Sequence, residues 1–221
     1  MKATKKPEAR TSGSTIVNVI LDMSGSMMSV WDVTIDSYNE YINGLKQDAN
    51  KYKVSLTLFD TVAIEYPYTA LDIKKVPKLT KAVYTPRSGT PLYDAVCSTL
   101  NKIRTKVKKT DKALVVIITD GQENSSREYT EKEMVAIKEE LEKLGNWTFV
   151  YLGANQDAWD TAQKWGFAGQ NVSSYHATER GTQTMSSNLT AATMSLGAMR
   201  GSTSTTQMFT KKQQKENEDT K

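Results

Sequence analysis

Short apolar runs, each followed by a polar loop and a helical pattern, recur along the chain. Three runs carry apolar side chains at both odd and even positions, as in strands buried on both faces: residues 16–21, 113–118 and 147–152. Apolar residues at steps of three and four predict helices over residues 31–48, 92–107, 131–144 and 181–199. This alternation predicts an α/β fold with three α-β-α layers and a mostly parallel central sheet.

Residues 53–59 alternate polar and apolar side chains, which predicts a strand exposed on one face. A turn at Asp60 and Thr61 precedes a second strand pattern at residues 62–68. This hairpin would place one antiparallel strand at the edge of the sheet.

The two ends of the chain differ from its middle in composition. Residues 1–14 hold four basic residues and one acidic residue, and predict a disordered basic leader. Residues 201–221 are polar and charged, and predict a disordered tail. We therefore expect one domain over residues 15–200. The formal net charge of +4 lies mainly at the ends, so the folded part is close to neutral and offers no basic face for nucleic acid.

The sequence also bears on the compartment. No apolar run approaches the roughly 20 residues that cross a bilayer, so we expect no membrane partner. The first 14 residues lack the apolar core of a secretory signal. Cys97 is the single cysteine, which permits no internal disulfide and favours a cytoplasmic location.

The first buried run ends at Asp22, and Ser24 and Ser26 follow at alternate positions. Ligands of open α/β sheets bind at the carboxyl ends of the strands, where these side chains would lie. A carboxylate and two hydroxyls in a tight turn are hard oxygen ligands, which suit Mg²⁺ or Mn²⁺. This turn is therefore a candidate metal site.

Two later segments complete a known pattern. Asp22, Ser24 and Ser26 resemble the first segment of the metal-ion-dependent adhesion site of von Willebrand factor A (vWA) domains. Residues 88–95 resemble its second segment, in which Thr90 is the metal ligand, and Asp120, at the end of a buried run, resembles the third. The resemblance extends over residues 15–200 and implies the Rossmann-like vWA fold.

Thr90 has a second interpretation from the sequence. It precedes Pro91, which fits the first position of a helix, so Thr90 is also a plausible helix N-cap. The two roles would compete for one hydroxyl group. The presence of the other two segments favours the ligand role.

The resemblance implies a set of roles. Ser24, Ser26 and Thr90 would bind Mg²⁺ or Mn²⁺ directly, while Asp22 and Asp120 would act through water or through the ligating hydroxyls. An Asp or Glu carboxylate of a partner protein would take the open coordination position. In its stand-alone format the chain resembles intracellular bacterial or phage vWA proteins, which are often associated with AAA-type ATPases or assemblies. The surrounding rim would contact the partner through Met27, Ser88, Gly89, Gly121, Gln122 and Glu123.

Two other classes of function remain as alternatives. The domain could be an assembly scaffold whose metal site stabilises the fold or is vestigial. A metal-dependent hydrolase is less well supported, because a haloacid-dehalogenase-like phosphatase needs a second Asp where this chain has Ser24. Nor does the chain carry a Gly-x-Ser-x-Gly elbow or, after its first strand, Gly-x-Gly-x-x-Gly. We therefore expect a binding protein and not an enzyme.

Overall fold

The computed structural model describes residues 13–154, 158–176 and 178–219. The predicted leader, residues 1–14, lies almost wholly outside them. The central sheet has the strand order β3-β2-β1-β4-β5-β6. All neighbouring strands are parallel except β2 and β3, which form the predicted antiparallel edge. The strands are β1 (Thr15–Asp22), β2 (Tyr52–Phe59), β3 (Ile64–Asp72), β4 (Lys112–Thr119), β5 (Trp147–Ala154) and β6 (Val172–Tyr175).

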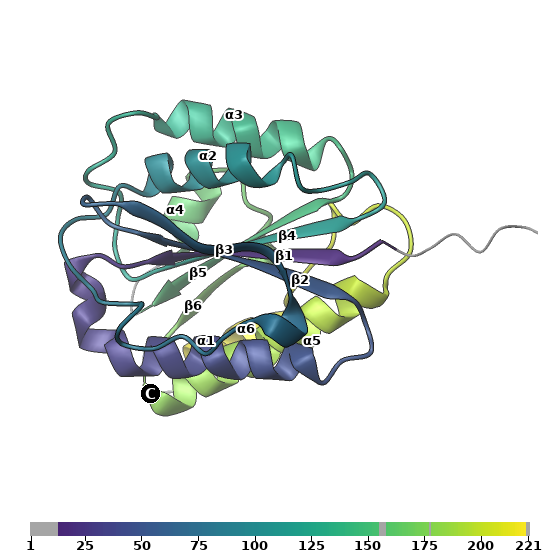
Figure 1. The fold of residues 1–221 in the computed structure, drawn as a ribbon, viewed down its shortest axis with the longest axis horizontal. Coiled ribbons are helices and arrows are strands. Elements are labelled where there is room, and N and C mark those ends of the chain that lie inside the picture. The colour runs from purple at the N-terminus through teal and green to yellow at the C-terminus, as the bar shows by residue number, and fades with distance from the viewer. Residues whose placement is uncertain (1–12, 155–157, 177, 220–221) are drawn as a thin grey trace, which may run out of the picture.

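Helices cover both faces of the sheet, as Figure 1 shows, so the predicted three-layer α/β fold is confirmed. One face carries α2 (Leu92–Ile103), α3 (Glu131–Glu142) and α4 (Ala158–Lys164). The other carries α1 (Trp31–Lys46), α5 (Glu179–Ala198) and α6 (Lys211–Glu218). Short 3₁₀ turns lie at η1 (Gly25–Val30), η2 (Ile73–Lys75) and η3 (Gly169–Asn171).

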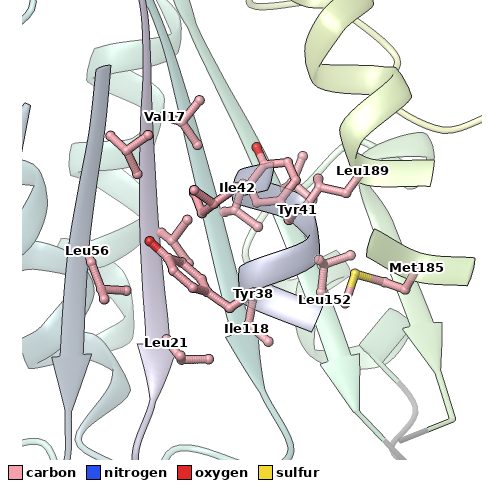
Figure 2. Packing of buried hydrophobic residues seen from close by; sticks show 14 of the residues in the cluster. Val17, Leu21, Tyr38, Tyr41, Ile42, Leu56, Ile118, Leu152, Met185 and Leu189 are labelled. Carbon is pink, nitrogen blue, oxygen red and sulfur yellow. The ribbon is translucent and has the colours of Figure 1, made fainter. Parts of the chain in front are cut away.

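Each central strand contributes to two cores. In β4, Val115 and Ile117 pack towards α2 and α3, while Leu114 and Val116 pack towards α1 and α5. On the α1 side, Tyr38, Tyr41 and Ile42 of α1 pack over the sheet beside Met185 and Leu189 of α5 (Figure 2). The two-sided burial explains why this run is apolar at every position.

Strand β2 differs from the prediction of one exposed face. Seven of its eight residues are buried, including Ser55 and Thr57. These hydroxyls have protein partners, because Ser55 accepts from the Ala70 amide at 3.0 Å and Thr57 from the Thr99 hydroxyl of α2 at 3.1 Å. Polar residues that are paired in this way resemble solvent-facing residues in a sequence pattern, although they lie inside.

The tail also differs from the prediction, because residues 201–219 are not disordered. Met208 and Phe209 are buried in the core on the α1 and α5 side. Thr210 then begins α6 with a reciprocal capping box to Gln213. The Gln214 side chain donates to the Val172 carbonyl of β6 at 2.7 Å. The burial of Met208 and Phe209 and the capping box at Thr210 together order this polar segment. The segment covers the edge of β6.

Lys112 joins the start of β4 to the end of α5. Its ammonium group donates to the carbonyls of Leu196, Gly197 and Met199 at 2.8, 2.6 and 2.5 Å. Partial burial lowers the pKa of this lysine. The contact satisfies carbonyl groups that the last turn of a helix cannot pair internally.

We expect Lys112→Met to lower the free energy of unfolding by about 1–3 kcal/mol, because three charge-assisted hydrogen bonds are lost. Equilibrium denaturation in urea measures this change. Lys109→Met removes a charge from a nearby exposed position and is the control. Equal stability of the two variants would contradict the proposed role of Lys112.

Candidate metal centre

Asp22 ends β1 and is fully buried. One carboxylate oxygen accepts from the Ser24 amide at 2.7 Å, and the other from the Thr119 hydroxyl at 2.6 Å. The Tyr84 hydroxyl donates to the carbonyl of Asp22 at 2.7 Å. Because both carboxylate oxygens already have protein donors, Asp22 organises the turn and is suited to act on an ion indirectly.

Ser24, Ser26 and Asp120 form a chain of oxygen atoms beside Asp22. The Ser24 and Ser26 hydroxyl oxygens lie 3.1 Å apart, and Ser26 donates to Asp120 at 2.6 Å. A serine that gives its proton to a carboxylate keeps lone pairs for a cation. The first and third sequence segments therefore meet directly, across 94 residues.

Gly121 brings the second segment into the same place. A Cβ atom built on Gly121 would lie 3.5 Å from the Thr90 hydroxyl oxygen and 3.6 Å from that of Ser26. Thr90 is itself 2% exposed. The structure thus gathers Asp22, Ser24, Ser26, Thr90 and Asp120 at the carboxyl ends of β1 and β4.

The alternative interpretation of Thr90 as a helix N-cap is wrong. Helix α2 begins at Leu92, Pro91 occupies the N-cap position, and no side-chain cap bond is made there. The free amides of the first turn are satisfied from another loop, since Tyr93 donates to the Glu123 carboxylate at 3.1 Å and Asp94 to the Ser126 hydroxyl at 3.2 Å. The Thr90 hydroxyl is therefore not used as a cap.

The rim residues that the sequence predicted fall into three groups. Ser88 and Gln122 are exposed, and Gly89 and Gly121 are partly buried at the site. Met27 is wrong as a contact residue, because its side chain is fully buried in the core with Val30. Its neighbour Met28 is instead 50% exposed, and the sequence offered no signal that distinguishes the two.

Glu123 has a structural role that the sequence did not reveal. One of its oxygens accepts from the amides of Ser125 and Ser126 at 2.8 and 2.7 Å, and the other accepts from α2. Its carboxylate therefore orders the loop between β4 and α3, residues 120–130, which we call the third loop, and it caps helix α2.

Burial makes both carboxylates of the centre reluctant to ionise. It raises the pKa of Asp22 to about 6, although the hydrogen bonds from Thr119 and Ser24 oppose the change. Burial also raises the pKa of Asp120, against the hydrogen bond from Ser26. Both shifts arise mainly from the loss of solvent, and a cation bound beside these carboxylates would oppose them by stabilising the ionised form.

The donor set fits Mg²⁺ or Mn²⁺. It consists of three hydroxyl and two carboxylate groups, all hard oxygen donors. Among the described residues, no group of three or more His, Cys, Asp or Glu side chains forms an alternative metal site. Ser24, Ser26 and Thr90 are the residues that would hold the ion, with Asp22 and Asp120 balancing its charge.

Gly89 is where the loops of the rim converge. A Cβ atom there would lie 2.5 Å from the Ser125 hydroxyl oxygen, 3.0 Å from Asn124 Oδ1 and 3.2 Å from Thr61 Cγ2. Gly89→Ala should therefore push the third loop away from Thr90, lower the free energy of unfolding by about 1–3 kcal/mol and weaken metal binding.

Thermal denaturation with and without Mg²⁺ measures both effects of Gly89→Ala. Gly166→Ala is the control, since nothing lies within 4 Å of a Cβ atom there, although its positive φ of 66° adds local strain. Unchanged metal dependence in Gly89→Ala would contradict the loop arrangement.

Comparison with known proteins agrees with the fold. A family model described as "VWA domain containing CoxE-like protein" matches residues 4–160. No curated protein matches the chain. Among solved structures, the SpRpn10 VWA domain has a TM-score of 0.57 at 9% identity, and the match covers 79% of this chain and 94% of that one.

Two longer proteins contain a similar domain. The pilus adhesin SpaC of Lactobacillus rhamnosus GG, in an open conformation, has a TM-score of 0.68 at 9% identity, with 84% of this chain and 30% of that chain covered. Proximal thread matrix protein 1 of the mussel byssus has a TM-score of 0.59 at 11% identity, with 83% of this chain covered. The match spans about half of that mussel protein, at 47%. At these identities the likeness concerns the fold.

Proposed function

The chain belongs to the family of VWA domain containing CoxE-like proteins, and on this premise we propose that it binds a partner protein through a Mg²⁺ or Mn²⁺ ion. Domains of this family typically mediate protein interactions. The ion would lie at Ser24, Ser26 and Thr90, and a partner Asp or Glu would complete its coordination.

The observation that carries the proposal is the convergence of three distant segments on one set of oxygen atoms. Ser26 bonds to Asp120, and Thr90 lies beside Gly121. Hydroxyl groups are a poor choice for stabilising a protein core, because each buried hydroxyl needs a partner. Several of them around two carboxylates are better explained by a cation.

The charge of the site favours an anionic partner group. Three neutral hydroxyl ligands add no charge, and Asp22 and Asp120 engage protein donors. A divalent ion held in this way remains an effective electrophile. Mg²⁺ usually keeps several water molecules, so exchange of one for a partner carboxylate is chemically reasonable.

Apolar residues near the site suggest what surrounds that carboxylate. Met28 follows the first metal segment, and Val62 follows Thr61, which hydrogen-bonds to Ser88; they are 50% and 68% exposed. Large apolar side chains on a polar rim are typical of binding surfaces. We propose that the partner places apolar side chains beside its acidic residue.

Met28→Ser and Val62→Ser should each weaken partner binding by about 1 kcal/mol or more, because contact area is lost. Calorimetric titration with the partner protein, once it has been identified by the capture experiment below, measures this loss. Leu144→Ser is the matched control, since Leu144 is 63% exposed and follows α3, at the opposite end of the strands. An equal effect of Leu144→Ser would contradict the location of the surface.

The proposal also concerns the class of partner, the location of the protein and its activity. The near-neutral domain gives no reason to expect a nucleic-acid partner, and no helix in the described residues is long and apolar enough to cross a membrane. The buried lone thiol of Cys97 fits a reducing cytoplasm. An AAA-type ATPase or an assembly is the kind of partner we propose, and we propose no catalytic activity.

Capture of partners from the native host's lysate tests the proposal. The bait would be used with Mg²⁺ and with EDTA, and Asp120→Ala would be the matched variant. We expect a partner that is retained by the wild-type protein with Mg²⁺ and released by EDTA. A partner retained equally under all three conditions would instead favour the assembly scaffold with a stabilising or vestigial site.

A further inference from the structure

The third loop is fastened to α2 by two carboxylates that act in opposite directions. Glu123, on the loop, accepts from the first turn of α2 at Tyr93. Asp94, on α2, accepts from the loop amides of Arg127, Glu128 and Tyr129 at 2.8, 3.0 and 2.8 Å. Asp94 is 7% exposed. These bonds make the loop and the helix one structural unit.

Asn124 lies on this unit and holds the backbone of Thr90 at both of its polar groups. The Thr90 amide donates to the side-chain Oδ1 of Asn124 at 2.9 Å, and the backbone amide of Asn124 donates to the Thr90 carbonyl at 3.1 Å. Both backbone hydrogen bonds of Thr90 in the described part of the chain go to this one residue.

The helix itself does not fix Thr90. The first helical hydrogen bond runs from the Ala95 amide to the Pro91 carbonyl, one residue beyond Thr90. Pro91 has no amide hydrogen of its own to donate. The preceding Gly89 restricts the chain less than any other residue would. The direction of the Thr90 hydroxyl therefore depends on the bonds to Asn124.

We propose that Asn124 is a positioning residue for the metal centre: it aims the Thr90 hydroxyl at the space beside Gly121 and Ser26. The inference rests on the proposed function and adds a residue that does not touch the ion. Outer residues of this kind tune metal affinity by orienting the ligands.

The structure supplies a conservative replacement. The Asn124 side-chain oxygen accepts from the Thr90 amide and from the Ser125 hydroxyl. Asp has the same shape and accepts both bonds, whereas Ala accepts neither. Asn124→Asp should therefore keep the position of Thr90. Asn124→Ala keeps only the backbone bond to the Thr90 carbonyl and should loosen that position.

The structure also supplies a matched control. The Asn39 side chain of α1 makes two hydrogen bonds to the backbone of Leu79, donating to its carbonyl at 3.0 Å and accepting from its amide at 2.8 Å. Asn39→Ala removes an asparagine side chain and both of these bonds, one backbone contact more than Asn124→Ala removes from Thr90, but Leu79 belongs to no metal segment. It controls for a general loss of stability.

Two measurements on the full-length protein test the inference. Calorimetric titration with Mn²⁺ should show affinity about 10-fold or more weaker in Asn124→Ala, with Asn39→Ala near the wild type and Asn124→Asp as tight or tighter. Amide hydrogen exchange without metal should show that Thr90 loses protection in Asn124→Ala and keeps it in Asn124→Asp.

The outcomes separate this inference from the proposed function. Equal Mn²⁺ affinity in Asn124→Ala and the wild type, or equal weakening in Asn39→Ala, would overturn the role of Asn124 alone. Unchanged exchange of the Thr90 amide in Asn124→Ala would do the same. A wild-type protein that binds no Mn²⁺ would overturn the proposed function as well.

Discussion

Asp22→Asn should stabilise the metal-free protein by about 2–3 kcal/mol at pH 7.5, because it removes a carboxylate that burial keeps from ionising easily. The pKa of Asp22 is raised from 3.8 to about 6 in the fold, so its ionisation costs stability at neutral pH. Asparagine can keep the bond from the Ser24 amide, and its own amide faces Thr119, whose hydroxyl also reaches the Gly121 carbonyl at 3.2 Å.

The pH dependence follows from the same shift. A carboxylate with a raised pKa in the folded state binds protons more tightly there, so the wild type regains this stability as the pH falls from about 6 towards 3.8. The advantage of Asp22→Asn should therefore disappear below about pH 4. Urea denaturation at a series of pH values without metal measures the difference.

Mg²⁺ should make the wild type more stable than Asp22→Asn, which reverses their order of stability without metal. At 1,000 times its dissociation constant, an ion that binds only the folded state adds about 4.1 kcal/mol to the wild type, which exceeds the advantage of the variant. The variant lacks the charge and should gain little. Asp60→Asn is the control, because Asp60 is equally buried and pairs with Arg87 outside the metal segments. A metal-free Asp22→Asn that is less stable than the wild type would contradict the electrostatic argument.

Phe209→Ala should lower the free energy of unfolding by about 3–5 kcal/mol, the usual cost of removing a buried phenylalanine. The Phe209 side chain is 1% exposed, and its amide donates to the Gln170 carbonyl at 2.9 Å. Helix α6 has no apolar residue and only eight residues, so it cannot persist without this anchor. Equilibrium denaturation should detect the loss.

Hydrogen exchange locates the effect of Phe209→Ala. Amides of α6 and of the adjoining β6 should lose protection first, while those of β1 and β4 stay protected. Val62→Ala is the control, since this side chain is 68% exposed and should change stability by less than about 0.5 kcal/mol. A stability close to the wild type in Phe209→Ala would indicate a disordered tail, as its composition suggests.

The buried strands were predictable because burial on two faces leaves a direct trace in the sequence. Val115 and Val116 face opposite cores, so both positions are apolar. The tail was not predictable in the same way, since two adjacent apolar residues order the 16 polar residues of the described segment 202–219. Side-chain amides such as Gln214, which bond to the edge of a strand, look the same in a sequence as amides in water.

The proximity of the candidate metal residues was predictable because it follows from their residue types and from their places at the ends of the buried runs. Ser26 and Asp120 are indeed bonded across the sheet. The supporting contacts were not predictable, because they join loops that are distant in sequence. Glu123 caps helix α2, which begins 31 residues earlier, and Asn124 accepts a hydrogen bond from the Thr90 amide. The sequence around Glu123 and Asn124 contains no pattern from which these partners could be identified.

A calorimetric titration of Mg²⁺ into the wild type and into Thr90→Val tests the central claim most directly. Valine keeps the shape of Thr90 but removes its hydroxyl, and Thr99→Val, on α2 away from the site, is the matched control. We expect one bound ion in the wild type and in Thr99→Val, and binding at least about 10-fold weaker in Thr90→Val. Equal affinity in all three proteins, or no binding by the wild type, would contradict a metal centre built from the three segments.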